Sequence, residues 1–111
     1  MAKFMLLLYN EPAAWQDLSP EQAQVAMERY RAWRTKPFTT DSARLGEDFG
    51  KVLRSKNGKP VASDGPYSET KEVLGGYYTI EAADYEEAVR LAQEHPHLEY
   101  GAIEIRRLWG Q

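Results

Sequence analysis

Ionisable side chains are concentrated between Asp64 and Glu72, where the sequence DGPYSETKE leads directly into an apolar strand. A carboxylate at Asp64 or Glu72 is suited to move a proton, and the ammonium group of Lys71 is suited to hold an anionic part of a substrate. A tight Asp-Gly-Pro turn and the following strand would fix these groups relative to one another. We therefore predict that this segment forms the wall of a ligand site, with Asp64, Lys71 and Glu72 as catalytic residues.

The same segment also has a purely structural interpretation. Asp-Gly-Pro is common turn chemistry, in which Asp64 caps the backbone and Gly65 adopts a positive φ. A run of Glu, Thr, Lys and Glu is usually a solvated surface, although this is less natural directly before a strand that is apolar on both faces. Strand alternation would place Thr70 and Glu72 on one side and Lys71 on the other, so a shared cavity requires a bulge or a dimer partner.

Aromatic residues supply most of the candidate ligand-binding positions. Tyr9 and Trp15 are candidates for the wall of an aromatic cavity. Tyr77 and Tyr78 are neighbours in a strand and point to opposite faces, so at most one of them can meet a ligand. We predict Tyr9, Thr70 and Tyr78 as ligand-binding residues. The competing interpretation for the tyrosines is ordinary core packing.

No metal or organic cofactor is expected. The chain has no cysteine, and its two histidines, His95 and His97, lie on either side of Pro96. This spacing does not put both imidazoles on one helical face, which argues against a metal pair. The glycines do not form a nucleotide-binding pattern. Any chemistry would therefore depend on the side chains alone.

Length and composition narrow the class of protein. A chain of 111 residues has the usual size of a single domain, and no linker-like segment divides residues 1–111. The formal charge is -3, with Lys and Arg scattered among Asp and Glu, so nucleic acid and membrane surfaces are not expected partners. The longest apolar run is too short for a membrane span, and the absence of cysteine suits the cytoplasm.

Hydrophobic periodicity and capping signals predict two central strands and two helices. Phe4 to Tyr9 is apolar at every position, and 73–80 carries apolar or aromatic side chains on both faces, as expected of strands in the middle of a sheet. Capping boxes at Ser19 and Asp84 begin two amphipathic helices, and each of these helices ends at a proline.

Shorter signals complete the sheet. Asn57-Gly58 predicts a hairpin turn with positive φ at both positions. Ile103 and Ile105 alternate with charged residues in a last strand, and a short strand is expected at 44–47. The pair Gly75-Gly76 inside the second central strand indicates a bulge or the close approach of another group.

This order of elements is that of a split βαβ, which is an α+β ferredoxin-like fold whose antiparallel sheet has both helices on one face. The other face then has no cover, although two central strands present apolar side chains on it. An exposed apolar patch of that size marks an interface. We therefore predict a homodimer in which two sheets pack face to face.

The segment from Asp64 to Glu72 and its continuation LGGYY resemble the YCII-related proteins, in particular the branch called after its motif DGPFAETKE. The start KFMLLLYNEPAAW, the segment LSPEQ and the ending EIRRLW support this resemblance, which covers most of the chain. It implies a dimeric α+β barrel. Members of the branch often occur in the company of extracytoplasmic-function sigma factors, and the resemblance implies no particular activity.

Two features depart from the family pattern. The segment from Lys36 to Lys51 is shorter and more polar than the glycine-rich stretch expected there, which affects the second strand and that wall of any pocket. Better-known relatives in the wider superfamily use a His-Asp pair. That pair has no counterpart here, because the only histidines flank Pro96.

Two classes of function remain open. The first is a small cofactor-free enzyme that transfers a proton, of the isomerase or lyase type, on a small polar or cyclic substrate. The second is a non-catalytic ligand-binding or regulatory dimer, for example one accessory to sigma-factor signalling. A carboxylate and a lysine in one enclosed pocket would favour the enzyme, and the same residues on an open surface would favour the binder.

Overall fold

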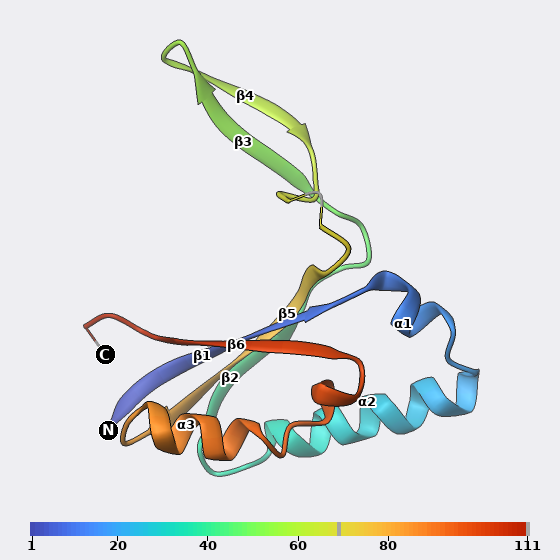
Figure 1. The fold of residues 1–111 in the computed structure, drawn as a ribbon, viewed down its shortest axis with the longest axis vertical. Coiled ribbons are helices and arrows are strands. Elements are labelled where there is room, and N and C mark those ends of the chain that lie inside the picture. The colour runs from blue at the N-terminus through green and yellow to red at the C-terminus, as the bar shows by residue number, and fades with distance from the viewer. Residues whose placement is uncertain (69, 111) are drawn as a thin grey trace.

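A four-stranded antiparallel sheet is the centre of the fold (Figure 1), in a computed structural model that describes residues 1–68 and 70–110. The strands follow the order β2-β5-β1-β6 across the sheet, with bounds of Ala2–Asn10 for β1, Thr39–Arg44 for β2, Val73–Ala82 for β5 and Gly101–Arg107 for β6. Each neighbouring pair is antiparallel. The predicted α+β ferredoxin-like fold is therefore confirmed.

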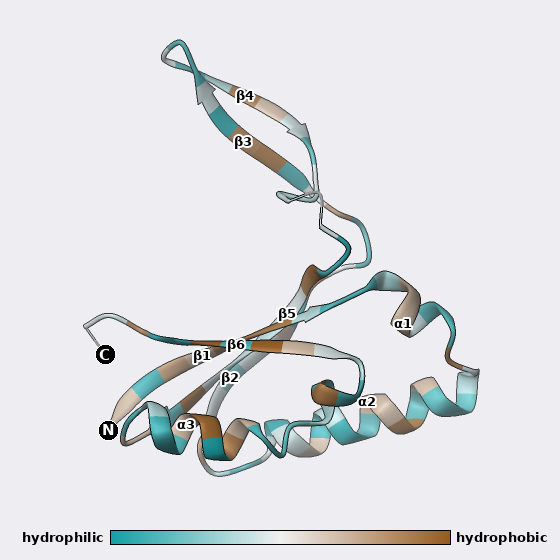
Figure 2. Ribbon diagram, viewed as in Figure 1, coloured by the Kyte–Doolittle hydropathy of each residue, from teal (hydrophilic) through white to brown (hydrophobic). Residues whose placement is uncertain are grey.

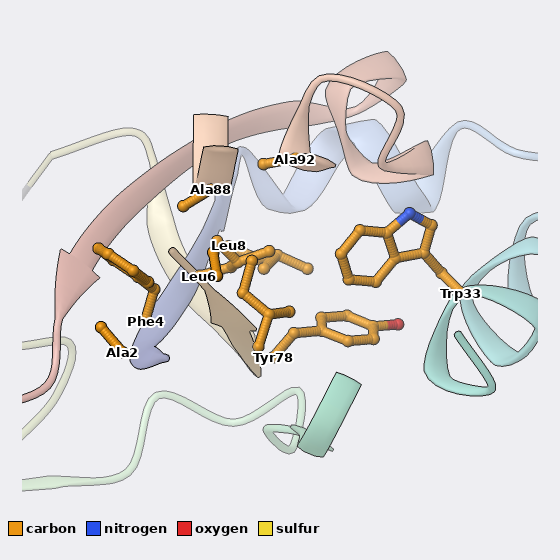
Figure 3. Packing of buried hydrophobic residues seen from close by; sticks show 10 residues of the cluster. Ala2, Phe4, Leu6, Leu8, Trp33, Tyr78, Ala88 and Ala92 are labelled. Carbon is orange, nitrogen blue, oxygen red and sulfur yellow. The ribbon is translucent and has the colours of Figure 1, made fainter. Parts of the chain in front are cut away.

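The helices lie on one face of this sheet. Their bounds are Pro12–Gln16 for α1, Pro20–Arg34 for α2 and Tyr85–Ala92 for α3, and a 3-10 turn, η1, spans Pro96–Glu99. Every second residue of β1 is buried. The apolar ones, such as Leu6, pack with Trp33 of α2 and Ala88 of α3 in one cluster (Figure 3). Burial of this apolar surface holds both helices against the sheet.

Both long helices begin as the sequence predicts. Ser19 accepts a hydrogen bond from the backbone N–H of Gln22, and the Gln22 side chain accepts one from the Ser19 N–H. Asp84 accepts from the N–H of Glu87, and the Glu87 carboxylate accepts from the N–H of Ala83. Each cap satisfies backbone donors that a helix start would leave unpaired, a contribution of roughly 1 kcal/mol.

A hairpin projects away from the sheet (Figure 1). It consists of β3 (Lys51–Lys56) and β4 (Lys59–Asp64), which pair only with each other in the part of the chain that the structure describes. Asn57 and Gly58 have φ values of 52° and 78°, so the predicted turn is confirmed. Most hairpin side chains are exposed, including Leu53 at 70 %. Figure 2 shows that β3 contains an apolar stretch between hydrophilic residues.

The second strand lies earlier than predicted. The pattern predicts a strand at 44–47, whereas β2 spans Thr39–Arg44 and is followed by a loop. Threonine favours strands, but β2 is a polar strand at the edge of the sheet and has no apolar alternation to reveal it. The short helix α1 is not predicted either, because five residues are too few to show a helical period.

The glycine pair of β5 permits close packing. The register between β1 and β5 shifts beside Gly75, which has no partner residue on β1. A Cβ on Gly75 would meet Oδ1 of Asn10 at 2.8 Å, and a Cβ on Gly76 would meet the carbonyl oxygen of Ala43 at 2.8 Å. Both of the expected features, a bulge and a close approach, are therefore confirmed.

The second face of the sheet has no helix on it among the described residues (Figure 1). Met5, Leu7 and Tyr9 alternate with the buried residues of β1 and therefore point to this open face. Leu7 is paired with Tyr77 on one side and with Glu104 on the other. The open face thus has an apolar centre with charged residues beside it.

Candidate functional site

A hollow of about 650 Å³ lies on the helix side of the sheet, lined by residues of α1, α2, β2 and β5. Aromatic rings line much of its wall, namely those of Trp15, Tyr30, Phe49 and Tyr78. The charged side chains that line it are Arg31, Arg34, Arg44, Glu47 and Asp48. This volume and this mainly apolar wall suit a small organic ligand. We call it the first hollow.

Tyr30 and His97 form a hydrogen-bonded pair in the wall of the first hollow. Oη of Tyr30 lies 2.6 Å from Nδ1 of His97, and Nε2 of His97 lies 2.8 Å from the carbonyl oxygen of Tyr9. A carbonyl oxygen can only accept, so Nε2 carries the proton of the neutral ring and Nδ1 carries a lone pair. Tyr30 therefore donates its proton to Nδ1, and its own oxygen can still accept a hydrogen bond from a ligand.

Burial keeps both members of the pair neutral. It raises the pKa of Tyr30 well above the ordinary value of 10.0, and it lowers the pKa of His97 below the ordinary value of 6.5. The hydrogen bond to Tyr9 and the carboxylate of Glu72 act against the shift of the His97 pKa. His97 is thus an unprotonated imidazole at neutral pH, which is the state that a proton acceptor requires.

His95 holds the turn that carries His97. Nδ1 of His95 accepts a hydrogen bond of 3.0 Å from the backbone N–H of His97 and so caps η1. The His95 ring lies against Trp33 and Tyr78, with centroid distances of 4.5 Å to each. Burial, with a smaller contribution from the neighbouring His97, lowers the pKa of His95 to about 3. His95 is therefore a neutral support within the aromatic core.

Four of the predicted site residues, Tyr9, Thr70, Lys71 and Glu72, line a second hollow of about 1010 Å³. The expectation that Lys71 faces away from Thr70 and Glu72 is wrong, because these residues precede β5 and strand alternation does not apply to them. Instead, Oγ1 of Thr70 donates a hydrogen bond of 2.8 Å to the carbonyl oxygen of Glu72 in a turn. All three side chains are exposed. The two hollows share the wall that contains Leu45 and Phe49.

Asp64 lies apart from the other predicted site residues. It is the last residue of β4, and its exposed carboxylate forms an ion pair with Nζ of Lys51. It lines neither of the two hollows. Gly65 does not adopt the positive φ expected for the turn. Its lack of a side chain serves close packing instead, because a Cβ there would meet the carbonyl oxygen of Phe49 at 1.8 Å.

Tyr77 and Tyr78 point to opposite faces of the sheet, as predicted. Tyr78 lines the first hollow and donates a hydrogen bond of 3.0 Å to the carbonyl oxygen of Tyr30. Burial raises the pKa of Tyr78 to about 12. Tyr77 lies on the open face and donates to Asp41 at 3.2 Å. Only Tyr78 of this pair can therefore contact a ligand in the first hollow.

The sequence does not reveal the Tyr30–His97 pair or the arginines beside it. The sequence contained one signal that could have pointed to this pair: two histidines flank a proline directly after a helix, and loops and turns often carry functional residues. Within residues 1–68 and 70–110, no group of three or more His, Cys, Asp or Glu side chains is arranged to hold a metal ion. Over the same residues, no helix combines the length and the apolar character needed to cross a membrane.

Comparisons with known proteins identify the family. The structure resembles that of 5-chloro-2-hydroxyhydroquinone dehydrochlorinase from Burkholderia phenoliruptrix AC1100, in complex with 2,5-dihydroxybenzoquinone, with a TM-score of 0.54, 14% identity and coverage of 96% of this chain and 92% of that chain. An identity this low shows a shared fold only. An uncharacterised protein of Rhizobium meliloti (strain 1021) is 28% identical over 114 residues, which cover 95% of this chain and 90% of the relative. The family model of the YCII-related domain matches residues 2–110, and the chain therefore belongs to the YCII-related domain family.

Proposed function

We propose that this protein is a small cofactor-free enzyme that transfers a proton, of the isomerase or lyase type, on a small hydroxylated cyclic substrate bound in the first hollow. One observation carries the proposal. The hydroxyl of Tyr30 lies 2.6 Å from an unprotonated nitrogen of His97, in the wall of a hollow of about 650 Å³. This arrangement can accept a proton from a bound substrate without any cofactor.

The proton step follows from the hydrogen bonds. A substrate O–H that meets Oη of Tyr30 gives up its proton to that oxygen, while the proton of Tyr30 moves to Nδ1 of His97. The imidazolium that forms keeps its Nε2–H on the carbonyl oxygen of Tyr9. The carboxylate of Glu72 favours this charged state, since it raises the pKa of His97. The proton then returns to another atom of the substrate or to solvent.

The fold and the walls of the hollow support a ring as the substrate. Trp15, Tyr30 and Tyr78 line the hollow, and aromatic walls favour planar ligands. The dehydrochlorinase with a similar fold is in complex with 2,5-dihydroxybenzoquinone, a hydroxylated ring. We transfer to this chain only the class of ligand, a small hydroxylated ring.

The test is the conversion of enol to ketone in phenylpyruvate and in its uncharged methyl ester, followed by the loss of enol absorbance. We expect acceleration by the wild type and a loss of roughly 100-fold or more in Tyr30→Phe, because general acid–base groups contribute on that scale. Tyr100→Phe is the matched control: its ring stacks on Trp15, but it does not line the hollow. An equal rate in wild type and Tyr30→Phe, with both proteins folded by circular dichroism, would refute the proposal.

A non-catalytic ligand-binding or regulatory dimer is the second candidate, and accessory action in sigma-factor signalling belongs to it. The observation that favours it is the exposure of Asp64, Lys71 and Glu72, none of which lies in the first hollow. Catalytic roles for these three residues, and ligand contacts by Tyr9 and Thr70 in the second hollow, stay predictions. Binding of both probes without any acceleration would favour this candidate.

We also propose that the protein is a homodimer joined through the open face of its sheet. The apolar centre of that face around Leu7 and Tyr77 supports the proposal, because surfaces of this kind are normally covered.

A further inference from the structure

The charged side chains that line the first hollow have a net positive charge, although the whole chain has a formal charge of -3. Arg31 and Arg34 come from the last turn of α2, and Arg44 is the last residue of β2. Two acidic residues, Glu47 and Asp48, line the same hollow, so the cations exceed the anions by one. The local charge is thus opposite in sign to that of the chain.

Arg44 is held in place by groups that leave most of its donors unused. Its guanidinium carbon lies 5.8 Å from the centroid of the Trp15 ring, and one of its nitrogens lies 3.6 Å from Sδ of Met27. Its ion pair with Glu47 is long, at 3.5 Å, and both side chains are more than half exposed. Such a pair contributes little, so an incoming anion can replace it at little cost. The planar guanidinium can match a carboxylate in a two-point contact.

The other two arginines have no ion pair among the described residues. Two of these three cations act on tyrosines that line the hollow. Arg29, outside the hollow, and Arg44 oppose the upward shift of the Tyr30 pKa, and Arg34 opposes that of Tyr78. The field of the arginines therefore reaches the rings that line the hollow.

We propose that the ligand of the first hollow carries a carboxylate, which Arg44 receives with support from Arg31 and Arg34, in addition to the hydroxyl group that meets Tyr30. The substrate class is a small hydroxylated ring acid, and this deepens the proposed function because it concerns the same site. A stacked ring between Trp15 and the strand face, an acid at Arg44 and a hydroxyl at Tyr30 would use the aromatic, cationic and hydroxyl groups of the hollow.

The test is calorimetric titration of the full chain with para-hydroxybenzoate and with para-hydroxybenzamide, which has the same shape but no charge. We expect the wild type to bind the acid at least about tenfold more tightly than the amide, which is the scale of a charge-assisted hydrogen bond. Arg44→Gln should remove most of the preference, because it weakens binding of the acid much more than binding of the amide, while Arg31 and Arg34 remain. Arg44→Lys should keep part of it, because the charge remains but the two-point contact is lost.

Arg29→Gln is the matched control. Arg29 lies on α2, pairs with Glu99 at 2.7 Å and does not line the hollow, although its charge also acts on Tyr30. This variant makes the same change in net charge without removing a group that can contact the ligand, so it should keep the preference. Equal affinity of the wild type for acid and amide, no binding of either probe, or an unchanged preference in Arg44→Gln would each overturn the inference. Failure of the proposed function looks different: neither phenylpyruvate nor its ester would be converted, whatever the acid preference in binding.

Discussion

His95 shows how one buried residue serves the candidate site without facing it. The side chain is 3 % exposed, and its ring packs against Trp33 and Tyr78. Nδ1 accepts the N–H of His97, while Nε2 is buried and has no hydrogen-bond partner among residues 1–68 and 70–110. Protonation at Nδ1 would break the first contact and leave a charge in the core. The neutral ring is therefore a condition for the geometry of the Tyr30–His97 pair.

This environment predicts a loss of stability in mild acid. The pKa of His95 is about 3 in the folded protein and near 6.5 in the unfolded chain, so below about pH 6.5 the unfolded state binds the additional proton. The contribution of His95 is fully present above pH 6.5 and is lost as the pH falls toward 3. We expect the free energy of unfolding, from urea titrations between pH 7.5 and 4.5, to change little through this group above pH 6.5 and to fall with a slope that approaches about 1.4 kcal/mol per pH unit below it.

His95→Asn is the control for this prediction. Asparagine keeps an acceptor for the His97 N–H but does not titrate. The free energy of unfolding of this variant should therefore fall less steeply with decreasing pH than that of the wild type, and the difference is the contribution of His95. The lowered pKa of His97 acts in the same direction and remains in both proteins. Equal slopes in the two proteins would show that His95 titrates normally in the folded state.

At the scale of elements, the sequence predicted correctly those features that depend on neighbouring residues, namely the helix caps and the hairpin turn. The caps at Ser19 and Asp84 and the turn at Asn57-Gly58 depend on neighbouring residues, and all three are present in the structure. The edge strand β2 was placed too late, because its polar residues are set by pairing with β5 rather than by their own pattern. The α+β ferredoxin-like fold followed from the order of elements and so was predicted correctly.

The candidate site depends on contacts between distant parts of the chain. Tyr30 and His97 are 67 residues apart in sequence, and His97 and Tyr9 are 88 residues apart. No spacing rule connects residues at such separations, whereas the DGPYSETKE segment attracts attention because its ionisable residues are contiguous. Contiguity proved a poor guide to proximity: Asp64 pairs with Lys51 on the hairpin, away from Lys71 and Glu72.

The hairpin β3–β4 is predicted to be dispensable for the fold of the sheet. None of its residues belongs to the core cluster, and a two-stranded hairpin has little stability of its own. Gly65 N–H donates to the carbonyl oxygen of Gly50 at 2.9 Å, so the ends of the excised segment are already adjacent. Replacing residues 51–64 by an Asn-Gly turn should leave cooperative thermal unfolding, measured by circular dichroism, with a similar midpoint.

Adding a single methyl group inside the sheet should lower the stability of the fold more than removing the whole hairpin does. A Cβ on Gly101 would lie 1.9 Å from the carbonyl oxygen of Tyr9, which is backbone and cannot move aside. Gly101→Ala should therefore lower the midpoint further than the excision does. Loss of the cooperative transition in the excised protein alone would mean that the hairpin is part of the folding unit.

At the scale of the whole molecule, the two faces of the sheet differ in what covers them and in the residues that they present. The helix side contains the core cluster and the first hollow, whereas the open face presents Leu7 and Tyr77 with charged residues beside them. The hydrogen bond of Tyr9 to Glu104 and that of Tyr77 to Asp41 orient polar groups on this face. An apolar centre within a polar surround is the composition of many protein interfaces.

The proposed homodimer predicts that charge at the centre of the open face separates the subunits without unfolding them. Leu7→Arg puts a guanidinium beside Glu104, which the monomer tolerates, but the same charge would be desolvated between two sheets. Light scattering after size exclusion should give about twice the chain mass of 12.7 kDa for the wild type and a single chain mass for Leu7→Arg.

Val25→Arg is the matched control, since Val25 is an exposed apolar residue of α2, on the helix side of the sheet. A wild type that elutes with the mass of one chain at micromolar concentration, or a Leu7→Arg variant that stays dimeric while Val25→Arg dissociates, would exclude the open face as the interface.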